Sequence, residues 1–127
     1  MKILISEDND QKFKSILNVV LDVYPEAEVT RATYSKEGVI LLKNERFDFL
    51  IQDMFLPINS DSRIDNKGGI YALNRIRHRN IDVKYCVCSS DAISYETMKE
   101  AGFQDTPFID YSSFNFQMDL IKFLKSK

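Results

Sequence analysis

The chain has 127 residues, of which 44% are hydrophobic and 28% are charged. This length is enough to bury one hydrophobic core and too short for two ordinary domains, so we expect a single domain over residues 1–127. The 17 Lys and Arg against 19 Asp and Glu give a net charge of −2, which excludes the basic surplus needed to neutralise many nucleic-acid phosphates. No apolar stretch approaches the roughly 20 residues of a membrane helix, and no targeting segment precedes the first apolar run, so we expect a soluble, cytoplasmic protein with no membrane insertion.

Short apolar runs alternate along the chain with segments of helical period, which is the usual sign of a parallel sheet with crossover helices. Strands are expected at residues 2–6, 28–32, 49–51, 85–88 and 108–109. The sequence therefore predicts an α/β fold, a doubly wound five-stranded parallel sheet with helices on both faces. Residues at the ends of the helices place the first four. The first ends at Tyr24 and Pro25, the second runs from Ser35 as N-cap to Asn44, the third follows Gly68 and Gly69, and the fourth ends at Gly102. The last helix is recognised by its apolar face, which carries Phe114, Met118, Ile121 and Leu124.

Two cysteines, Cys86 and Cys88, fall in the fourth apolar run. We expect them to point to opposite sides of a strand and not to pair, because side chains alternate along a strand. A lone C-x-C without a second pair or nearby histidines is a weak metal signal, so we interpret both as reduced core residues. Reduced thiols are typical of the cytoplasm.

Acidic residues follow the expected strands at the edge of the sheet where ligands bind in open parallel α/β folds. Glu7 and Asp8 come after the first strand, Asp53 after the third, and Ser89 and Ser90 after the fourth. Right-handed crossovers would make the first and third strands neighbours, so the three carboxylates would share one crevice. Like charges that close repel strongly in a partly dry site unless a cation or shared protons are present. Oxygen ligands of this kind suit Mg²⁺.

Five segments, taken in order, resemble a CheY-like receiver domain of two-component response regulators. They are Ile3-Leu4-Ile5-Ser6-Glu7-Asp8, the stretch from Asp48 to Asp53 and on to Pro57, the glycine and helix from Gly69 to Arg77, the Ser89 or Ser90 hydroxyl, and Ala101-Gly102-Phe103. The resemblance covers essentially the whole chain. It implies a flavodoxin-like sheet in the order 2-1-3-4-5, with no output domain in the chain.

The resemblance also implies a chemistry. Asp53 would accept a phosphoryl group from the phosphohistidine of a sensor histidine kinase or phosphotransfer protein. Mg²⁺ would be held by Glu7, Asp8, Asp53 and the backbone carbonyl of Phe55. Ser89, which is nearer the strand end than Ser90, would hydrogen-bond a phosphoryl oxygen. The domain would not be an enzyme beyond self-phosphorylation and autodephosphorylation at Asp53, and it would signal to a downstream target protein by contact, commonly through residues 93–124.

Two features depart from the family pattern, and the bulk of Phe55 adds a prediction about hydrolysis. Receivers normally carry a lysine at the end of the fifth strand that pairs with the phosphoryl group, but the expected position falls near Ile109 or Asp110, and no basic residue lies between Lys99 and Lys122. The polar loop at about 58–67 is longer than usual; it either covers the site, binds a partner, or is a tolerated surface insertion. Phe55, two residues after Asp53, is bulky, and if it shields an acyl phosphate from water, hydrolysis should be slow.

Two alternatives stay open. The missing lysine favours a pseudo-receiver, which would be an interaction module of the same fold that is not regulated by phosphorylation. The stretch Asp8-Asn9-Asp10 after the first strand resembles the nucleophile and acid pair of haloacid dehalogenase-type phosphatases. That second reading leaves Asp53 and Pro57 without a role.

Overall fold

The computed structural model describes residues 1–60, 67–90 and 92–126. Within them, a five-stranded parallel sheet has the order β2-β1-β3-β4-β5. The fold class and strand order expected above are therefore confirmed. The strands are β1 (Lys2–Ser6), β2 (Glu28–Ala32), β3 (Phe49–Gln52), β4 (Lys84–Ser89) and β5 (Phe108–Asp110), and the helices are α1 (Asp10–Val23), α2 (Ser35–Asn44), α3 (Gly68–His78), α4 (Ala92–Glu100) and α5 (Phe116–Lys125).

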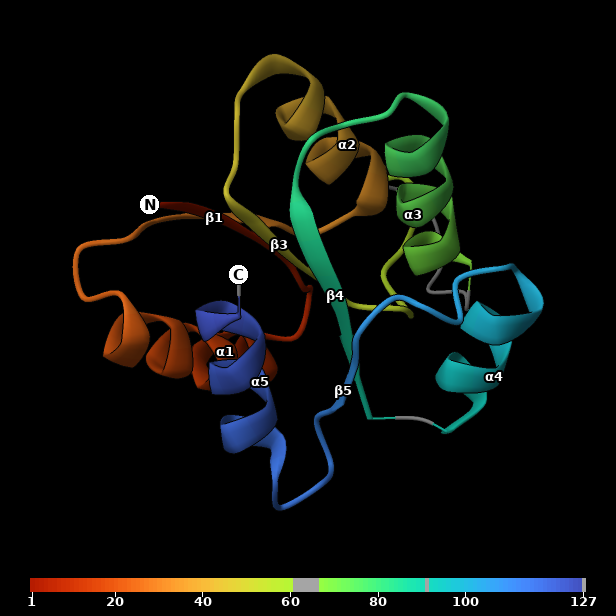
Figure 1. Ribbon diagram of the computed structural model, residues 1–127. Coiled ribbons are helices and arrows are strands. Elements are labelled where there is room, and N and C mark those ends of the chain that lie inside the picture. The colour runs from red at the N-terminus through yellow and green to blue at the C-terminus, as the bar shows by residue number, and fades with distance from the viewer. Residues whose placement is uncertain (61–66, 91, 127) are drawn as a thin grey trace.

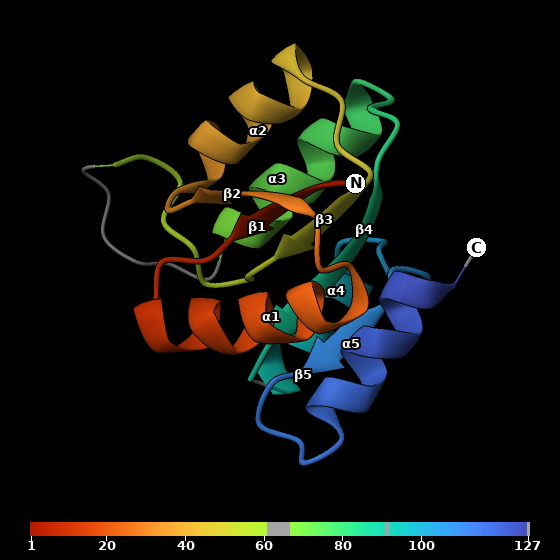
Figure 2. The same ribbon diagram turned by 90° about the vertical axis from the view of Figure 1, so that its left-hand side faces the viewer.

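The helices form a layer on each face of the sheet. Helices α1 and α5 lie side by side on one face, while α2, α3 and α4 cover the other (Figures 1 and 2). Strands covered on both faces must be apolar on both, which explains why β1 and β3 read as nearly continuous apolar runs rather than alternating ones. Ile3 and Ile5 pack toward α1 and α5, whereas Leu4 packs in a second cluster on the α2 side.

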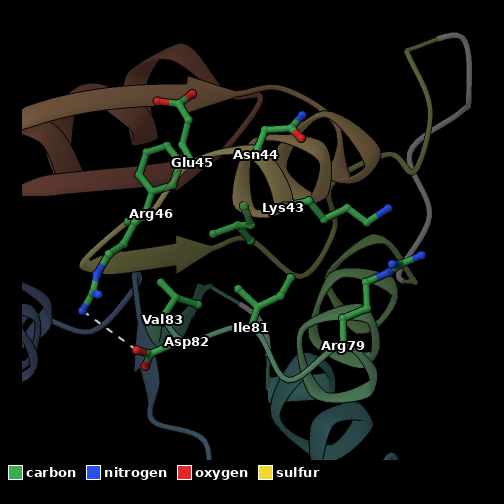
Figure 3. A pocket seen from close by; sticks show the side chains of 10 residues that line it. Lys43, Asn44, Glu45, Arg46, Arg79, Ile81, Asp82 and Val83 are labelled. Carbon is green, nitrogen blue, oxygen red and sulfur yellow. Dashed lines mark ion pairs between the residues drawn. The ribbon is translucent and has the colours of Figure 1, made fainter.

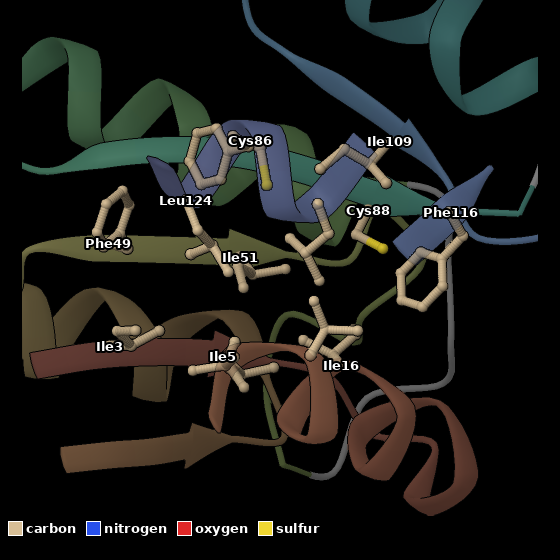
Figure 4. Packing of buried hydrophobic residues seen from close by; sticks show 14 residues of the cluster. Ile3, Ile5, Ile16, Phe49, Ile51, Cys86, Cys88, Ile109, Phe116 and Leu124 are labelled. Carbon is tan, nitrogen blue, oxygen red and sulfur yellow. The ribbon is translucent and has the colours of Figure 1, made fainter. Parts of the chain in front are cut away.

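The main core lies between the sheet and the α1–α5 pair. Figure 4 shows Ile51 and Ile109 from the strands facing Ile16 of α1 and Leu124 of α5, and all four are buried. Cys86 and Cys88 are free and buried in this same cluster. The expectation that they point to opposite sides was wrong, because residues two apart on a strand share a face.

The apolar face assigned to the last helix also needs correction. Phe114 precedes α5 and is 97% exposed, and Met118 is 62% exposed. The other two expected positions are confirmed, since Leu124 is buried and Ile121 packs against the main core. The buried residues of α5 are Phe116, Leu120, Phe123 and Leu124.

Two hydrogen bonds from Ser35, at the start of α2, hold the residues that flank the polar loop. The Ser35 hydroxyl does not cap α2 as expected; it donates to the Gly68 carbonyl at 2.7 Å, while the Ser35 amide donates to the Pro57 carbonyl at 2.8 Å. Gly68 packs so closely that a Cβ there would lie 1.5 Å from the Leu56 carbonyl oxygen. The glycine is therefore needed for close backbone approach. Residues 61–66 of the loop lie outside the described residues, so its three possible roles stay predictions.

Candidate functional site

A polar cavity of about 420 Å³ opens at the carboxyl edge of the sheet. It lies where the loops after β1, β3, β4 and β5 meet the first turn of α1, as expected for ligand sites in open α/β sheets. The residues that line it are Glu7, Asp8, Asn9, Gln11, Lys12, Asp53, Phe55, Ser89, Ser90 and Tyr111. The ligands and reacting groups that the receiver resemblance implies thus line one cavity, whereas Asp10 of the phosphatase alternative does not.

The sheet ladder brings the three acids together. The Glu7 amide donates to the Ala32 carbonyl and the Asp53 amide donates to the Ser6 carbonyl, both at 2.9 Å, so each acid continues the pairing just past its strand. Glu7, Asp8 and Asp53 each place a carboxylate oxygen within 4.8 Å of the other two. Glu7 and Asp53 are only 2% and 6% exposed, and Asp8 is half-buried.

A cation that was not expected from the sequence lies in this cluster. Lys12, in the first turn of α1, places its Nζ 2.8 Å from Glu7 Oε1 and 2.9 Å from Asp53 Oδ1. The same Nζ donates a 2.8 Å hydrogen bond to the backbone carbonyl of Cys88 on β4. Its contact with Glu7 is an ion pair rather than a well-aligned hydrogen bond. A signal was available, because Lys12 occupies the apolar face that it shares with Ile16 and Val19, where an unpaired lysine would be costly.

Burial and mutual repulsion perturb the acids. Desolvation and the neighbouring Asp53 charge raise the pKa of Glu7 to about 7, although Lys12 opposes this shift. Burial is also the main reason that the pKa of Asp8 is raised. For Lys12, burial alone would lower the pKa, but Asp53 and Glu7 together raise it, so the ammonium stays charged. The cluster therefore still carries excess negative charge with Lys12 in place.

The first turn of α1 is fixed by a side-chain cap. The side-chain Oδ1 of Asn9 accepts a 2.9 Å hydrogen bond from the backbone amide of Lys12, and the backbone amide of Asn9 donates to Glu7 Oε2 at 3.2 Å. Asparagine is among the best N-cap residues because its carbonyl satisfies a free helix amide. Arg31 Nε donates to the Glu7 carbonyl at 2.9 Å. The loop between β1 and α1 is thus tied down on both sides of the acid pair.

The two serines that line the cavity differ in exposure, and an aromatic ring lies beside them. Ser89 is 1% exposed and its hydroxyl lies 3.0 Å from the Ser94 hydroxyl of α4, whereas Ser90 is exposed. Which serine would bind a phosphoryl oxygen stays a prediction. Just past β5, the Tyr111 ring lines the cavity, with Lys12 Nζ 5.6 Å from its centre. This aromatic was not assigned from the sequence.

The donor set fits Mg²⁺, which takes oxygen ligands, keeps several waters and is usually bound through carboxylates together with phosphate oxygens. Ligand oxygens on one Mg²⁺ lie at most about 4 Å apart, given Mg–O distances near 2.0–2.1 Å. Small side-chain rotations would bring the three carboxylates, which lie within 4.8 Å of one another, into that range. Lys12 already pairs with two of the same carboxylates, so any metal would share them with it.

A second cavity, of about 630 Å³, lies at the opposite edge of the sheet. It is formed by the end of α2 and the loops that enter β3 and β4, and Figure 3 shows its side chains. The Arg46–Asp82 ion pair there spans 3.9 Å between two highly exposed side chains. Exposed pairs of this kind contribute little energy, and the cavity gathers no buried polar groups comparable to those of the acidic pocket.

Comparison with known proteins defines the architecture further. No protein-family model matches the sequence. The uncharacterized protein y4jS of Sinorhizobium fredii is 36% identical over 81 residues, which are 63% of this chain and 20% of that protein. The chain thus spans about one fifth of the length of that relative.

Solved structures match over nearly the whole chain. A CheY-like response regulator receiver domain protein from Methanospirillum hungatei has a TM-score of 0.69 at 22% identity, with 98% of this chain and 90% of that one covered. The chemotaxis response regulator CheY4 of Vibrio cholerae has a TM-score of 0.73 at 17% identity, with coverage of 98% and 95%. The N-terminal domain of an uncharacterized protein from Wolinella succinogenes has a TM-score of 0.69 at 23% identity, with coverage of 98% and 90%.

The strand order and the two helical layers define the doubly wound, flavodoxin-like class of α/β proteins. Within that class, the chain has the fold of the CheY-like response regulator receiver domains, as the resemblance of its motifs implied. Within the described part of the chain, no helix combines the length and the apolar character that crossing a bilayer requires.

Proposed function

We propose that this chain is a receiver module of a two-component signalling system that accepts a phosphoryl group on Asp53 with Mg²⁺ bound beside it. The observation that carries the proposal is the convergence of Glu7, Asp8 and Asp53 within 4.8 Å of one another at the carboxyl edge of a receiver fold. Three carboxylates held that close have a clear use when they bind a cation and present one of their number to an electrophile.

In the proposed reaction an Asp53 carboxylate oxygen attacks the phosphorus of a phosphohistidine. A P–O bond forms and the P–N bond breaks; the imidazole, already protonated on its other ring nitrogen, keeps the electron pair of the P–N bond and leaves as a neutral ring. Two hydrogen bonds of 2.9 Å hold the backbone of Asp53 in position for this. Its backbone amide donates to the Ser6 carbonyl, and Gln52 Nε2 donates to the backbone carbonyl of Asp53. Glu7, Asp8, Asp53 and the Phe55 carbonyl would hold Mg²⁺, whose positive charge would offset the charge on the transferring oxygens.

The Ser89 hydroxyl would donate a hydrogen bond to a phosphoryl oxygen after leaving its present partner, Ser94. That partner lies on α4, so the exchange offers a path from the site to the surface around α4, β5 and α5. A downstream target protein would read the change there. The phosphoryl donor would be a sensor histidine kinase or a phosphotransfer protein. The free, buried thiols suit a reducing compartment, and we place the protein in the cytoplasm.

The experiment is to incubate the protein with phosphoramidate and Mg²⁺ and weigh it by mass spectrometry. Wild type should gain the mass of one phosphoryl group, and Asp53→Asn should gain none. Asp48→Asn is the matched control, since Asp48 precedes β3 at its far end, and it should behave as wild type. No mass gain in wild type would contradict the proposal and favour a pseudo-receiver module.

The phosphatase hypothesis is not favoured by the position of Asp10. Its carboxylate pairs with Arg31 at 2.9 Å on the surface, its side chain is 86% exposed, and it does not line the acidic cavity. An acid that must protonate a leaving group has to reach the same substrate as the nucleophile. Asp8 therefore lacks the partner that this mechanism requires.

A further inference from the structure

Lys12 is the one basic residue among the described residues that line the acidic cavity. It is 8% exposed, although lysine is almost never buried unless it is paired. Its ammonium has three protons to donate and three close oxygen partners: Glu7 Oε1, Asp53 Oδ1 and the Cys88 carbonyl. The side chain is therefore held at the centre of the site rather than lying along its rim.

Contacts outside the acid cluster also hold this lysine in place. The Cys88 carbonyl belongs to the backbone of β4 and cannot move with the acids. The Tyr111 ring lies 5.6 Å from Nζ, and the Tyr111 hydroxyl donates to Ser15, which is three residues along α1 from Lys12. These contacts would keep the ammonium next to Asp53 if the acids were to turn toward a metal ion.

The fifth strand supplies no such cation. Asp110, in register with Ser89 of β4, is exposed, and its Oδ1 accepts bonds from the Ser112 amide at 2.9 Å and the Ser112 hydroxyl at 2.6 Å. The Asp110 carboxylate is thus stabilised by hydrogen bonds within the turn that follows the strand. The contribution of this segment to the cavity is the Tyr111 ring. A phosphoryl group on Asp53 would find its nearest side-chain cation on α1.

We propose that Lys12 is the catalytic cation of this site, and that α1 supplies the ammonium that binds a phosphoryl oxygen on Asp53. This inference rests on the proposed function. An ammonium 2.9 Å from the accepting carboxylate is already within reach of a tetrahedral group built on that carboxylate, so its stem needs only a small rotation. Charge-assisted bonds from an ammonium to phosphoryl oxygens are stronger than neutral ones, and they gain further in a partly dry cavity.

The same geometry gives Lys12 a second effect of opposite sign. In the free protein its ammonium pairs with Glu7 and Asp53, two of the three carboxylates that would hold Mg²⁺. Removing the ammonium should therefore tighten Mg²⁺ binding while weakening the binding of a phosphoryl group. A lysine that only supports the fold would weaken both when removed. A lysine that only stands in for the metal would affect Mg²⁺ alone.

The test compares wild type with Lys12→Met and with the control Lys14→Met, which makes the same change at an exposed position of the same helix. Beryllium fluoride, an analogue of the phosphoryl group, is titrated at saturating Mg²⁺, and Mg²⁺ alone is titrated by calorimetry. For Lys12→Met we expect the Kd for beryllium fluoride to rise roughly 10- to 100-fold, as for loss of a charged hydrogen bond. The Kd for Mg²⁺ should fall. Lys14→Met should match wild type in both.

Circular dichroism checks that each variant folds, and Lys12→Gln carries the same test should Lys12→Met not fold. Its amide can still donate to the Cys88 carbonyl but has no charge. If Lys12→Gln binds beryllium fluoride as wild type does, a hydrogen-bond donor suffices and the cation assignment is overturned. If wild type takes up phosphoryl from phosphoramidate and the Lys12 variants bind the analogue equally well, the inference fails while the proposed function stands. If wild type takes up neither probe, both fall.

Discussion

The raised pKa of Glu7 makes a sharp prediction about stability in the absence of divalent cations. Burial and the Asp53 charge raise this pKa from 4.5 to about 7, so the folded state holds a proton that the unfolded chain has already released across that interval. The contribution of Glu7 to the free energy of unfolding should therefore fall as pH rises between about 5 and 7. The difference between the two pKa values corresponds to a loss on the order of 3 kcal/mol in the free energy of unfolding by pH 8.

Replacing Glu7 with glutamine removes the charge that burial disfavours. With a chelator present at pH 8, Glu7→Gln should be more stable than wild type, by up to about 3 kcal/mol, and its stability should vary less between pH 5 and 8. Lost contact with Lys12 will offset part of the gain. Glu26→Gln, at an exposed position, is the control and should change neither quantity appreciably.

Urea titration, followed by the fluorescence of the six tyrosines and by circular dichroism, measures both effects. With Mg²⁺ the order should reverse, because the metal binds the ionised carboxylate: wild type should gain stability that Glu7→Gln does not, and the gain should grow as pH rises toward 8. A Glu7→Gln protein that is less stable than wild type at pH 8 in chelator would refute this reasoning.

Three further predictions concern packing and access. In Gly68→Ala, the new Cβ would lie 1.5 Å from the Leu56 carbonyl oxygen, so urea titration should show a loss of at least roughly 1–3 kcal/mol; an unchanged midpoint would show that the backbone there yields easily. Burial raises the pKa of Cys86 well above its usual value and that of Cys88 to about 12, so an aromatic disulfide reagent should label both only after unfolding, and rapid labelling of the native protein would count against this. Phe55 lines the cavity, so Phe55→Ala should shorten the lifetime of the phosphorylated protein, and mass spectrometry over time would expose an unchanged decay.

Much of the fold could be predicted from the sequence because its signals are local. The expected first and second strands match β1 and β2 as observed, and each of the other three extends by one or two residues at most. Apolar runs flanked by turn residues identify strands well when both faces are covered. The inward face of the last helix was only half predicted, because Phe114 and Met118 are apolar but exposed, whereas Ile121 and Leu124 do pack on the core.

The acid cluster could also be predicted, since it depends only on the order of the strands and on which residues follow them. The position of the cation could not be found in the same way. A receiver pattern directs attention to the end of β5, whereas the signal for Lys12 is its spacing from Ile16 and Val19 on the apolar face of α1. Only the rotation of α1, which brings Lys12 to the buried side with Ile16, separates it from the exposed Lys14.

The source of a cation matters because it decides which element responds to the reaction. A cation on a short strand such as β5 (Phe108–Asp110) would transmit a change at Asp53 into the segment beyond that strand. A cation on α1 would instead transmit it to a helix that packs along α5 and whose first turn is capped by Asn9. Movement of the Lys12 ammonium toward a phosphoryl group would loosen its bond to the Cys88 carbonyl and its contact with Tyr111. The segment after β5 would then sense phosphorylation through a side chain that comes from the opposite end of the chain.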